Sequence, residues 1–320
     1  MQQFTILNGR ALLRRLYGHL EETETELLIS MINRHSDIKA WFCPTAFWPQ
    51  FNRVNTPRLM CVPDVVITDF PIGFEVADGK PLYNRIKRLE KAIQGASHYV
   101  TYSEHVKWHT LVDGYDCRPD AVHVIPNASS DLFKLIHVSG TLDDEIATNL
   151  FCRQMLSLAL RTAPNPQYSL TFKNEFVEYI FYSSQFRPNK NVITLLRSFE
   201  YLLRRRYQGL KLILTGQSEI ADVREFIQKQ NLGHDVLFLS DLPLQQLAAC
   251  YRLARLAVTP TLSEGGFPFT FLEALSVGTP VVMSRIAVTE DVVTDPDLQA
   301  IMLFDPYDWR DMTERIEWAS

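Results

Sequence analysis

Short apolar segments alternate with helical segments along the second half of the chain, and this alternation constrains the fold more than any other feature. We predict nearly continuous apolar strands at residues 177–184, 210–215, 236–239, 256–260 and 279–283. We predict intervening helices at 191–204, 223–230 and 243–253. Gly233 is expected to end the second of these helices and Asp241 to cap the third. Continuous apolar strands joined by helices are typical of a parallel sheet covered on both faces, which indicates an α/β domain.

The first half shows a weaker form of the same pattern. We predict strands at residues 26–30, 38–43, 59–62, 98–103 and 121–125. We predict helices at 83–94 and 104–112. A chain of 320 residues is long for one hydrophobic core, so two domains are expected. We place them at 1–140 and 173–320, with residues 141–172 as a linker region that contains a helix at 145–160.

Composition excludes several classes of function. The formal net charge of −5 argues against general nucleic-acid binding, and no apolar run is long enough to span a membrane. The first residues lack the basic start and apolar centre of a signal peptide. The five cysteines are scattered and never form a Cys-x-x-Cys pair, which favours reduced thiols in the cytoplasm over disulfides or a zinc site.

A glycine-containing loop after the predicted strand at 256–260 is a candidate anion site. Glu264 precedes the loop, and Glu273 lies one turn into the helix that follows it. The free N–H groups and the dipole of a helix N-terminus both favour a phosphate at such a place. A glutamate near this end can also accept hydrogen bonds from the sugar hydroxyls of a nucleotide.

Two cationic side chains follow the predicted strand at 177–184. Arg187 and Lys190 lie on a loop there, because Pro188 disfavours a helical conformation at the residue before it. Ligands bind at the carboxyl edge of doubly wound sheets, where this loop and the glycine loop are both expected. A planar guanidinium and a compact ammonium together suit a diphosphate.

These motifs give the second half a resemblance to a known family. It resembles the C-terminal domain of glycosyltransferase family 4, a retaining family with the GT-B fold. The resemblance rests on Glu264-Gly265-Gly266, Pro268, Leu272-Glu273-Ala274 and Val277-Gly278-Thr279-Pro280-Val281-Val282, together with the loop Phe186-Arg187-Pro188-Asn189-Lys190-Asn191. It implies an α/β fold of GT-B type, in which two Rossmann-like domains with parallel sheets face each other across a cleft. Residues 1–140 would form the acceptor-side domain, and residues 173–320 would bind the donor nucleotide.

The resemblance also implies roles for particular residues. Arg187 and Lys190 would hold the donor diphosphate, Glu264 would face the donor sugar, and Glu273 would bind the ribose. These implied catalytic residues are Arg187, Lys190 and Glu264. The implied donor-binding residues are Ser184, Ser240, Asp241, Leu242, Gly265, Gly266, Phe267, Pro268, Phe269, Thr270 and Glu273. Such enzymes are generally independent of metals and cofactors, and the leaving phosphate itself takes the acceptor proton.

Three positions depart from the family pattern. Eight residues separate Glu264 from Glu273, where the family usually has seven. Arg187 comes two residues later than the arginine that the family often has. In the first half, Asp64 follows Pro63 where a His-Asp pair is expected, so Asp64 is an acceptor-side candidate, with a turn or capping role as the alternative.

The sequence therefore predicts a retaining glycosyltransferase that uses a nucleoside-diphosphate sugar, with UDP preferred, in polysaccharide or glycoconjugate synthesis. The expected acceptor is a saccharide or a lipid-linked saccharide, and no nucleic acid or metal is expected. A catalytically weak nucleotide-sugar-binding or scaffold module is the alternative, and a sugar-nucleotide epimerase is a third option. His105 and His109 have the spacing of a metal-ligand pair on a helix, but no third ligand accompanies them.

Two further expectations concern location and length. We expect a cytoplasmic protein with a peripheral contact at the inner membrane face, or else a plain solvated surface. The basic residues that favour this contact are Arg10, Arg14, Arg15, Arg85, Lys87, Arg88 and Lys91. A helix predicted at 309–318 runs almost to the end of the sequence, which suggests a truncated chain or one module of a longer product.

Overall fold

A computed structural model describes residues 9–78, 82–128, 130–161, 163, 178–216 and 220–320. The chain divides into two compact units, each built on its own parallel sheet. The first unit comprises Met1–Pro63, Pro81–Thr101 and Val106–Ile125. The second comprises Asp64–Lys80, Tyr102–His105 and Pro126–Ser320. The predicted α/β class is confirmed in both units.

The first unit contains a four-stranded sheet in the order β1-β2-β3-β4. Its strands are β1 (Trp41–Cys43), β2 (Arg58–Cys61), β3 (Tyr99–Thr101) and β4 (Val122–Val124). Its helices are α1 (Gly9–Arg34), η1 (Pro49–Arg53), α4 (Leu82–Gly95), the π-helix η2 (Val106–Gly114) and η3 (Pro119–Ala121). Leu89, Ala92 and Ile93 of α4 are fully buried, because apolar residues three and four apart share one helix face. Among the described helices of both units, none is long and apolar enough to cross a bilayer.

One strand predicted in the first half is wrong. Residues 26–30 belong to the long helix α1, where Ile29 and Ile32 are buried on one face. A short apolar run such as Leu27-Leu28-Ile29 fits a strand or a helix equally well, and its length does not decide between them. The glutamates that precede it are good helix formers, which favours the helix.

The second unit contains a six-stranded sheet in the order β10-β9-β8-β5-β6-β7. Its strands are β5 (Tyr179–Tyr182), β6 (Lys211–Leu214), β7 (Val236–Phe238), β8 (Leu256–Thr259), β9 (Val281–Ser284) and β10 (Leu303–Phe304). Strand β5 pairs with β6 on one side and with β8 on the other, so the strand order reverses between β5 and β8. Ligands of doubly wound sheets bind beside such a switch point, at the carboxyl ends of the strands.

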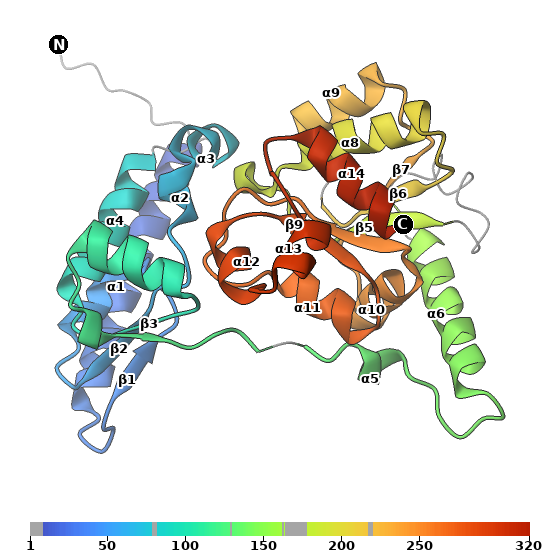
Figure 1. Ribbon diagram of the computed structural model, residues 1–320. Helices are drawn as coiled ribbons and strands as arrows, with labels where there is room; N and C mark the ends of the chain where they lie inside the picture. Colours follow the sequence, from blue (N-terminus) through green and yellow to red (C-terminus); the bar gives the residue numbers. More distant parts are fainter. Residues whose placement is uncertain (1–8, 79–81, 129, 162, 164–177, 217–219) are drawn as a thin grey trace, which may run out of the picture. The chain divides into compact units, whose positions relative to one another are not determined.

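Helices cover both faces of this sheet (Figure 1). One face packs against α8 (Val192–Arg205), α9 (Ala221–Lys229) and α14 (Trp309–Ala319). The other packs against α5 (Phe133–Ile136), α6 (Asp144–Arg161), α10 (Leu244–Leu253) and α11 (Phe269–Ser276). Successive residues of β5 point to opposite faces, so Ile180 and Tyr182 join the first cluster while Tyr179 and Phe181 join the second. Every strand predicted in the second half is therefore present and buried.

Four further α-helices in the described residues belong to the second unit. The second unit also contains α2 (Val66–Asp69), α3 (Pro71–Asp78), α12 (Ala287–Val292) and α13 (Pro296–Met302). Part of the region 141–172, which we expected to act as a linker, forms α6, and Cys152 and Leu156 of this helix are buried in the same cluster as residues of α10.

Two predicted helix signals are wrong. Helix α9 ends at Lys229, and Asn231, rather than Gly233, takes the left-handed conformation beyond it, with φ of 50°. Asp241 does not cap α10, because the N-cap residue is Pro243 and no side chain caps this helix. Asp241 instead has a φ of 54°, a left-handed conformation that aspartate tolerates better than most residues.

Candidate functional site

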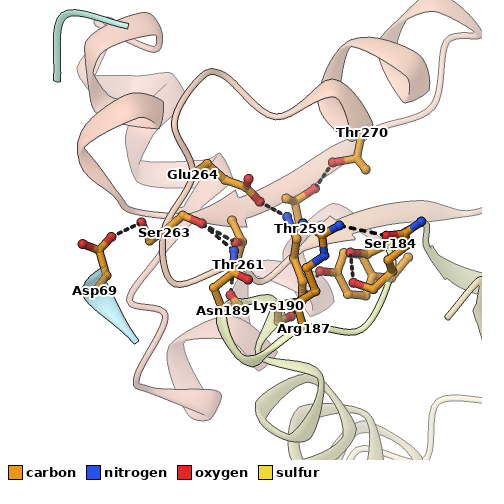
Figure 2. A network of polar contacts seen from close by, with 12 residues as sticks. Asp69, Ser184, Arg187, Asn189, Lys190, Thr259, Thr261, Ser263, Glu264 and Thr270 are labelled. Atoms are coloured by element: carbon orange, nitrogen blue, oxygen red, sulfur yellow. Dashed lines mark hydrogen bonds and ion pairs between the residues drawn. The ribbon is translucent and has the colours of Figure 1, made fainter. Parts of the chain in front are cut away.

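The carboxyl ends of β5 and β8 bring the two predicted loops together. After β5 the chain forms the short 3-10 helix η4 (Pro188–Lys190), and after β8 it enters the glycine loop. Asn189 joins them, because its Nδ2 donates to the Ser263 carbonyl at 2.9 Å and its own carbonyl accepts from Leu262 N at 2.8 Å. Figure 2 shows this network around Asn189. Asn189 is 3% exposed, so the connection between the loops is buried.

Local sequence places the two cations on this loop. Arg187 is extended, with φ of −132° and ψ of 163°, as expected before a proline. Asn191 has a left-handed φ of 53°, and its side chain donates to the Pro306 carbonyl at 2.7 Å. Helix α8 begins at the next residue, so Arg187 and Lys190 stay outside it at the carboxyl edge of the sheet.

Lys190 and Glu264, two of the predicted catalytic residues, form an ion pair in which the ammonium donates to the carboxylate (Figure 2). Their side chains are 19% and 21% exposed, so the pair is largely withdrawn from solvent. The Tyr182 hydroxyl donates to the Lys190 carbonyl at 3.1 Å and fixes the backbone there. Arg187, the third, is exposed, and its guanidinium donates to Gln185 Oε1 at 3.1 Å.

The glycine loop leads into the N-terminus of α11. No side chain caps this helix, whose N-cap residue is Pro268. The hydroxyls of Thr259 and Thr270 are hydrogen-bonded at 2.8 Å and tie the first turn of α11 to β8. The carbonyl of Gly265 accepts from Ser103 Oγ at 2.8 Å. An uncapped helix start beside two cations has the donors and the positive potential that a phosphate needs.

The predicted loop residues differ in what their side chains do. The ring of Phe267 contacts that of Phe271 edge-on at 5.0 Å, so this side chain packs on the protein. Pro268 is buried and Phe269 is half exposed, at 50%.

Glu273 lies one turn into α11 and is partly buried. Its Oε2 accepts a hydrogen bond from the Tyr251 hydroxyl at 2.9 Å. Burial raises the pKa of Glu273, and the hydrogen bond from Tyr251 opposes that rise in pKa. In the described part of the chain, no hydrogen bond reaches the other oxygen, Oε1.

A cavity of about 310 Å³ opens at the ends of β5, β6 and β7. Ser240, Asp241 and Arg187, three of the predicted site residues, line it together. The other residues that line it are Gln185, Phe186, Thr215, Gly216 and Ile220. Leu242 is outside this lining and packs against the core face that carries α10. Ser184 also lies outside it, and its backbone N–H donates to Thr215 Oγ1 at 2.9 Å.

Asp64 belongs to the second unit and lies within the electrostatic field of the two loops. Burial raises the pKa of Asp64, the nearby Glu264 raises it further, and Lys190 and Arg187 lower it. The neighbouring Asp69, which the sequence analysis missed, accepts a hydrogen bond from Ser263 Oγ at 2.6 Å (Figure 2). Two carboxylates from residues 64–69 thus accompany the glycine loop.

The other residues that sequence reasoning missed are Asn189 and Tyr251. Asn189 lies inside the motif between the two cations, so its position was visible but its role was not. Nothing in the sequence connects Tyr251 with Glu273, which lies 22 residues further along the chain. Within the described residues, no three His, Cys, Asp or Glu side chains gather as a metal-binding group.

Comparisons with known proteins find similarity to glycosyltransferases. Residues 171–320 match the family model "Glycosyl transferases group 1". O-antigen chain mannosyltransferase B of Escherichia coli is 31% identical over 124 residues, covering 38% of this chain and 32% of that protein. D-inositol 3-phosphate glycosyltransferase of Corynebacterium aurimucosum is 24% identical over 214 residues, covering 64% of this chain and 45% of that protein. The chain therefore spans less than half the length of either relative.

Solved structures confirm the fold class. Sucrose-phosphate synthase from Thermosynechococcus elongatus has a TM-score of 0.63 and 18% identity, over 99% of this chain and 73% of that one. Anabaena HepE in complex with UDP and glucose has a TM-score of 0.65 and 14% identity, over 99% and 74%. These likenesses confirm the predicted α/β fold of GT-B type, with two Rossmann-like domains on parallel sheets.

Proposed function

We propose that the protein is a retaining glycosyltransferase of family 4, which moves a sugar from a nucleoside-diphosphate sugar to a saccharide or lipid-linked acceptor. The observation that carries this proposal is the meeting of Lys190, Glu264 and the α11 N-terminus at one sheet edge. Arg187 and Glu273 lie on the same two connections, one after β5 and one after β8. The matched domain at residues 171–320 supports the same reaction class.

The donor diphosphate would bind between the cations and the start of α11. Lys190 would exchange its contact with Glu264 for the phosphate, and Arg187 would leave Gln185 to bind beside it. As the bond between the sugar C1 and the diphosphate oxygen breaks, both cations would stabilise the charge on the leaving group. The acceptor oxygen then bonds to C1 on the same face, and its proton passes to the leaving phosphate. Released from Lys190, Glu264 would face the donor sugar. We propose no metal in this reaction.

The nucleoside would extend from the phosphate along the ends of the neighbouring strands. Glu273 Oε1 is placed to accept from a ribose hydroxyl, and the cavity lined by Ser240 and Asp241 would hold the base. Uracil is our first choice, and UDP in the HepE complex supports it. On the acceptor side, Asp64 is our candidate, because its carboxylate is in the field of both Glu264 and Lys190.

We propose that this reaction serves polysaccharide or glycoconjugate synthesis in the cytoplasm, with a peripheral contact at the inner membrane face. The name of the E. coli relative, an O-antigen chain mannosyltransferase, supports a saccharide acceptor. The basic residues of α4 are exposed or partly exposed, which leaves them accessible to anionic lipid heads.

The alternative is a catalytically weak nucleotide-sugar-binding module. The eight-residue spacing between Glu264 and Glu273 favours this alternative, because the extra residue shifts Glu264 relative to the family pattern. That carboxylate is paired with Lys190.

Hydrolysis of donor sugars tests the proposal. We expect slow release of nucleoside diphosphate from a panel of UDP-, GDP- and ADP-sugars, and its loss in Lys190→Ala. Lys211→Ala is the matched control, because Lys211 is 22% exposed and also paired with a carboxylate, that of Asp235, but it lies at the amino end of β6. Full activity in Lys190→Ala would refute the phosphate role. Tight nucleotide binding without turnover on any donor would favour the binding module.

A further inference from the structure

The hydroxyl of Tyr251 is the contact that fixes the Glu273 carboxylate. Tyr251 lies on α10, is 0% exposed, and donates to Glu273 Oε2 at 2.9 Å. We propose that Tyr251 is a positioning residue that holds Glu273 with Oε1 turned toward the ribose of the donor. This inference rests on the proposed function, because Tyr251 would position Glu273, the residue that binds the ribose in that function.

The ring of Tyr251 has little freedom to move. It meets the Phe181 ring edge-on, with centroids 4.8 Å apart and planes at 90°. The Thr279 hydroxyl donates to the Tyr251 carbonyl at 2.7 Å, which ties the end of α10 to the residues before β9. A carboxylate held by such an anchored hydroxyl loses less entropy when it binds a ligand, because its orientation is already set.

A second hydroxyl lies beside the first. Ser183, directly after β5, lowers the pKa of Tyr251 through its side chain. Thr215 Oγ1 reaches Ser183 Oγ at 3.4 Å, and Thr215 also lines the cavity proposed for the base.

Burial favours the neutral form of the Tyr251 hydroxyl. The pKa of Tyr251 is raised well above its ordinary value, first by burial and then by the neighbouring Glu273. Tyr251 is therefore a neutral donor near neutral pH. A neutral hydroxyl bonded to a carboxylate also favours its ionised form, which is the better acceptor for ribose hydroxyls.

A buried tyrosine needs a hydrogen-bond partner, but that partner need not be a functional carboxylate. Tyr179 shows the contrast within the same cluster of buried residues. It is 1% exposed, and its hydroxyl donates to the backbone carbonyl of Cys250 at 2.7 Å. Tyr179→Phe removes a comparable buried hydrogen bond without touching Glu273, which makes it the matched control for Tyr251→Phe.

The test compares binding of UDP and GDP with binding of their 2′,3′-dideoxy analogues by calorimetry. In wild type we expect the better ribonucleotide to bind roughly tenfold more tightly than its dideoxy form, which is about the worth of one hydrogen bond to a charged group. Glu273→Ala should abolish this ratio. Tyr251→Phe should reduce the ratio by about three- to tenfold, Ser183→Ala should reduce it less, and Tyr179→Phe should leave it unchanged. Thermal unfolding of each variant reports its folding separately.

The outcomes separate the two proposals. If wild type binds neither UDP nor GDP, the proposed function fails, and the inference fails with it. If Glu273→Ala loses the ratio while Tyr251→Phe keeps the wild-type value, only the positioning role is wrong. An equal loss for ribose and dideoxy forms in Tyr251→Phe would show a merely structural role and would also overturn the inference. Should Tyr251→Phe not fold, Ser183→Ala decides, and an unchanged ratio in that variant contradicts the inference.

Discussion

Replacing Glu264 by glutamine tests whether this carboxylate competes with the donor phosphate for Lys190. The pair is largely buried, with side chains 19% and 21% exposed, so we take about 1 kcal/mol for it, the upper end of the range for exposed pairs. Breaking the pair costs this amount before Lys190 can bind a phosphate. Removing the competitor should therefore lower the Kd for UDP or GDP by about fivefold.

The matching variant Lys190→Met should have the opposite effect. Hydrogen bonds to charged groups contribute about 1.5–3 kcal/mol, so the Kd should rise by roughly ten- to over a hundredfold. Calorimetry on wild type, both single variants and the double variant completes the cycle. In the double variant the gain from Glu264→Gln should disappear, because there is no ammonium left to release.

Two results would refute this reasoning. If Glu264→Gln keeps its fold but binds the nucleotide no more tightly than wild type, the ion pair does not oppose binding. A fivefold gain that persists in the Lys190→Met background would show direct repulsion between the carboxylate and the phosphate instead of competition for the ammonium.

Further predictions concern the supports of the site. Gly216→Ala would place a Cβ about 2.1 Å from the Phe186 ring. It should lower the free energy of unfolding, measured in urea, by about 1–3 kcal/mol and weaken nucleotide binding. Gly209→Ala is the control, because its Cβ would lie in open space and should change neither quantity. Asn189→Ala removes one buried side-chain link between the two loops. It should cost about 1–2 kcal/mol in stability and also weaken nucleotide binding, because the loops that hold the site are then less well fixed. Because the pKa of Glu273 is raised in the folded protein, its ionised form opposes folding at pH 7. Glu273→Gln should therefore melt at pH 7 at a temperature equal to or higher than that of wild type. The difference in melting temperature should vanish as the pH falls below the ordinary pKa range of glutamate.

The second unit was predictable because its strands are buried on both faces. Each of β5 to β9 is an apolar run bounded by polar or glycine residues, and the predicted bounds differ from the observed ones by only a few residues. The first half offered weaker signals, since three of its four strands are only partly buried and are less uniformly apolar. A short apolar run does not distinguish a strand from part of a helix, and the strand predicted at 26–30 failed for this reason.

The candidate site was predictable only in part. Motif spacing placed Arg187, Lys190 and Glu264 at one sheet edge, because parallel strands all end there. Spacing did not reveal that Lys190 and Glu264 pair with each other, since that contact depends on side-chain directions. Tyr251 was invisible for a similar reason: its contact with Glu273 exists only once α10 and α11 have packed on the same face of the sheet.

The most direct test of the central claim is a crystal structure of the protein soaked with UDP or GDP. The account predicts the β-phosphate within hydrogen-bond distance of Lys190 Nζ and near the start of α11. It predicts the ribose hydroxyls on Glu273 Oε1, with Glu264 moved off Lys190. A nucleotide bound at another face, or one bound here with the Lys190–Glu264 pair still intact, would contradict it.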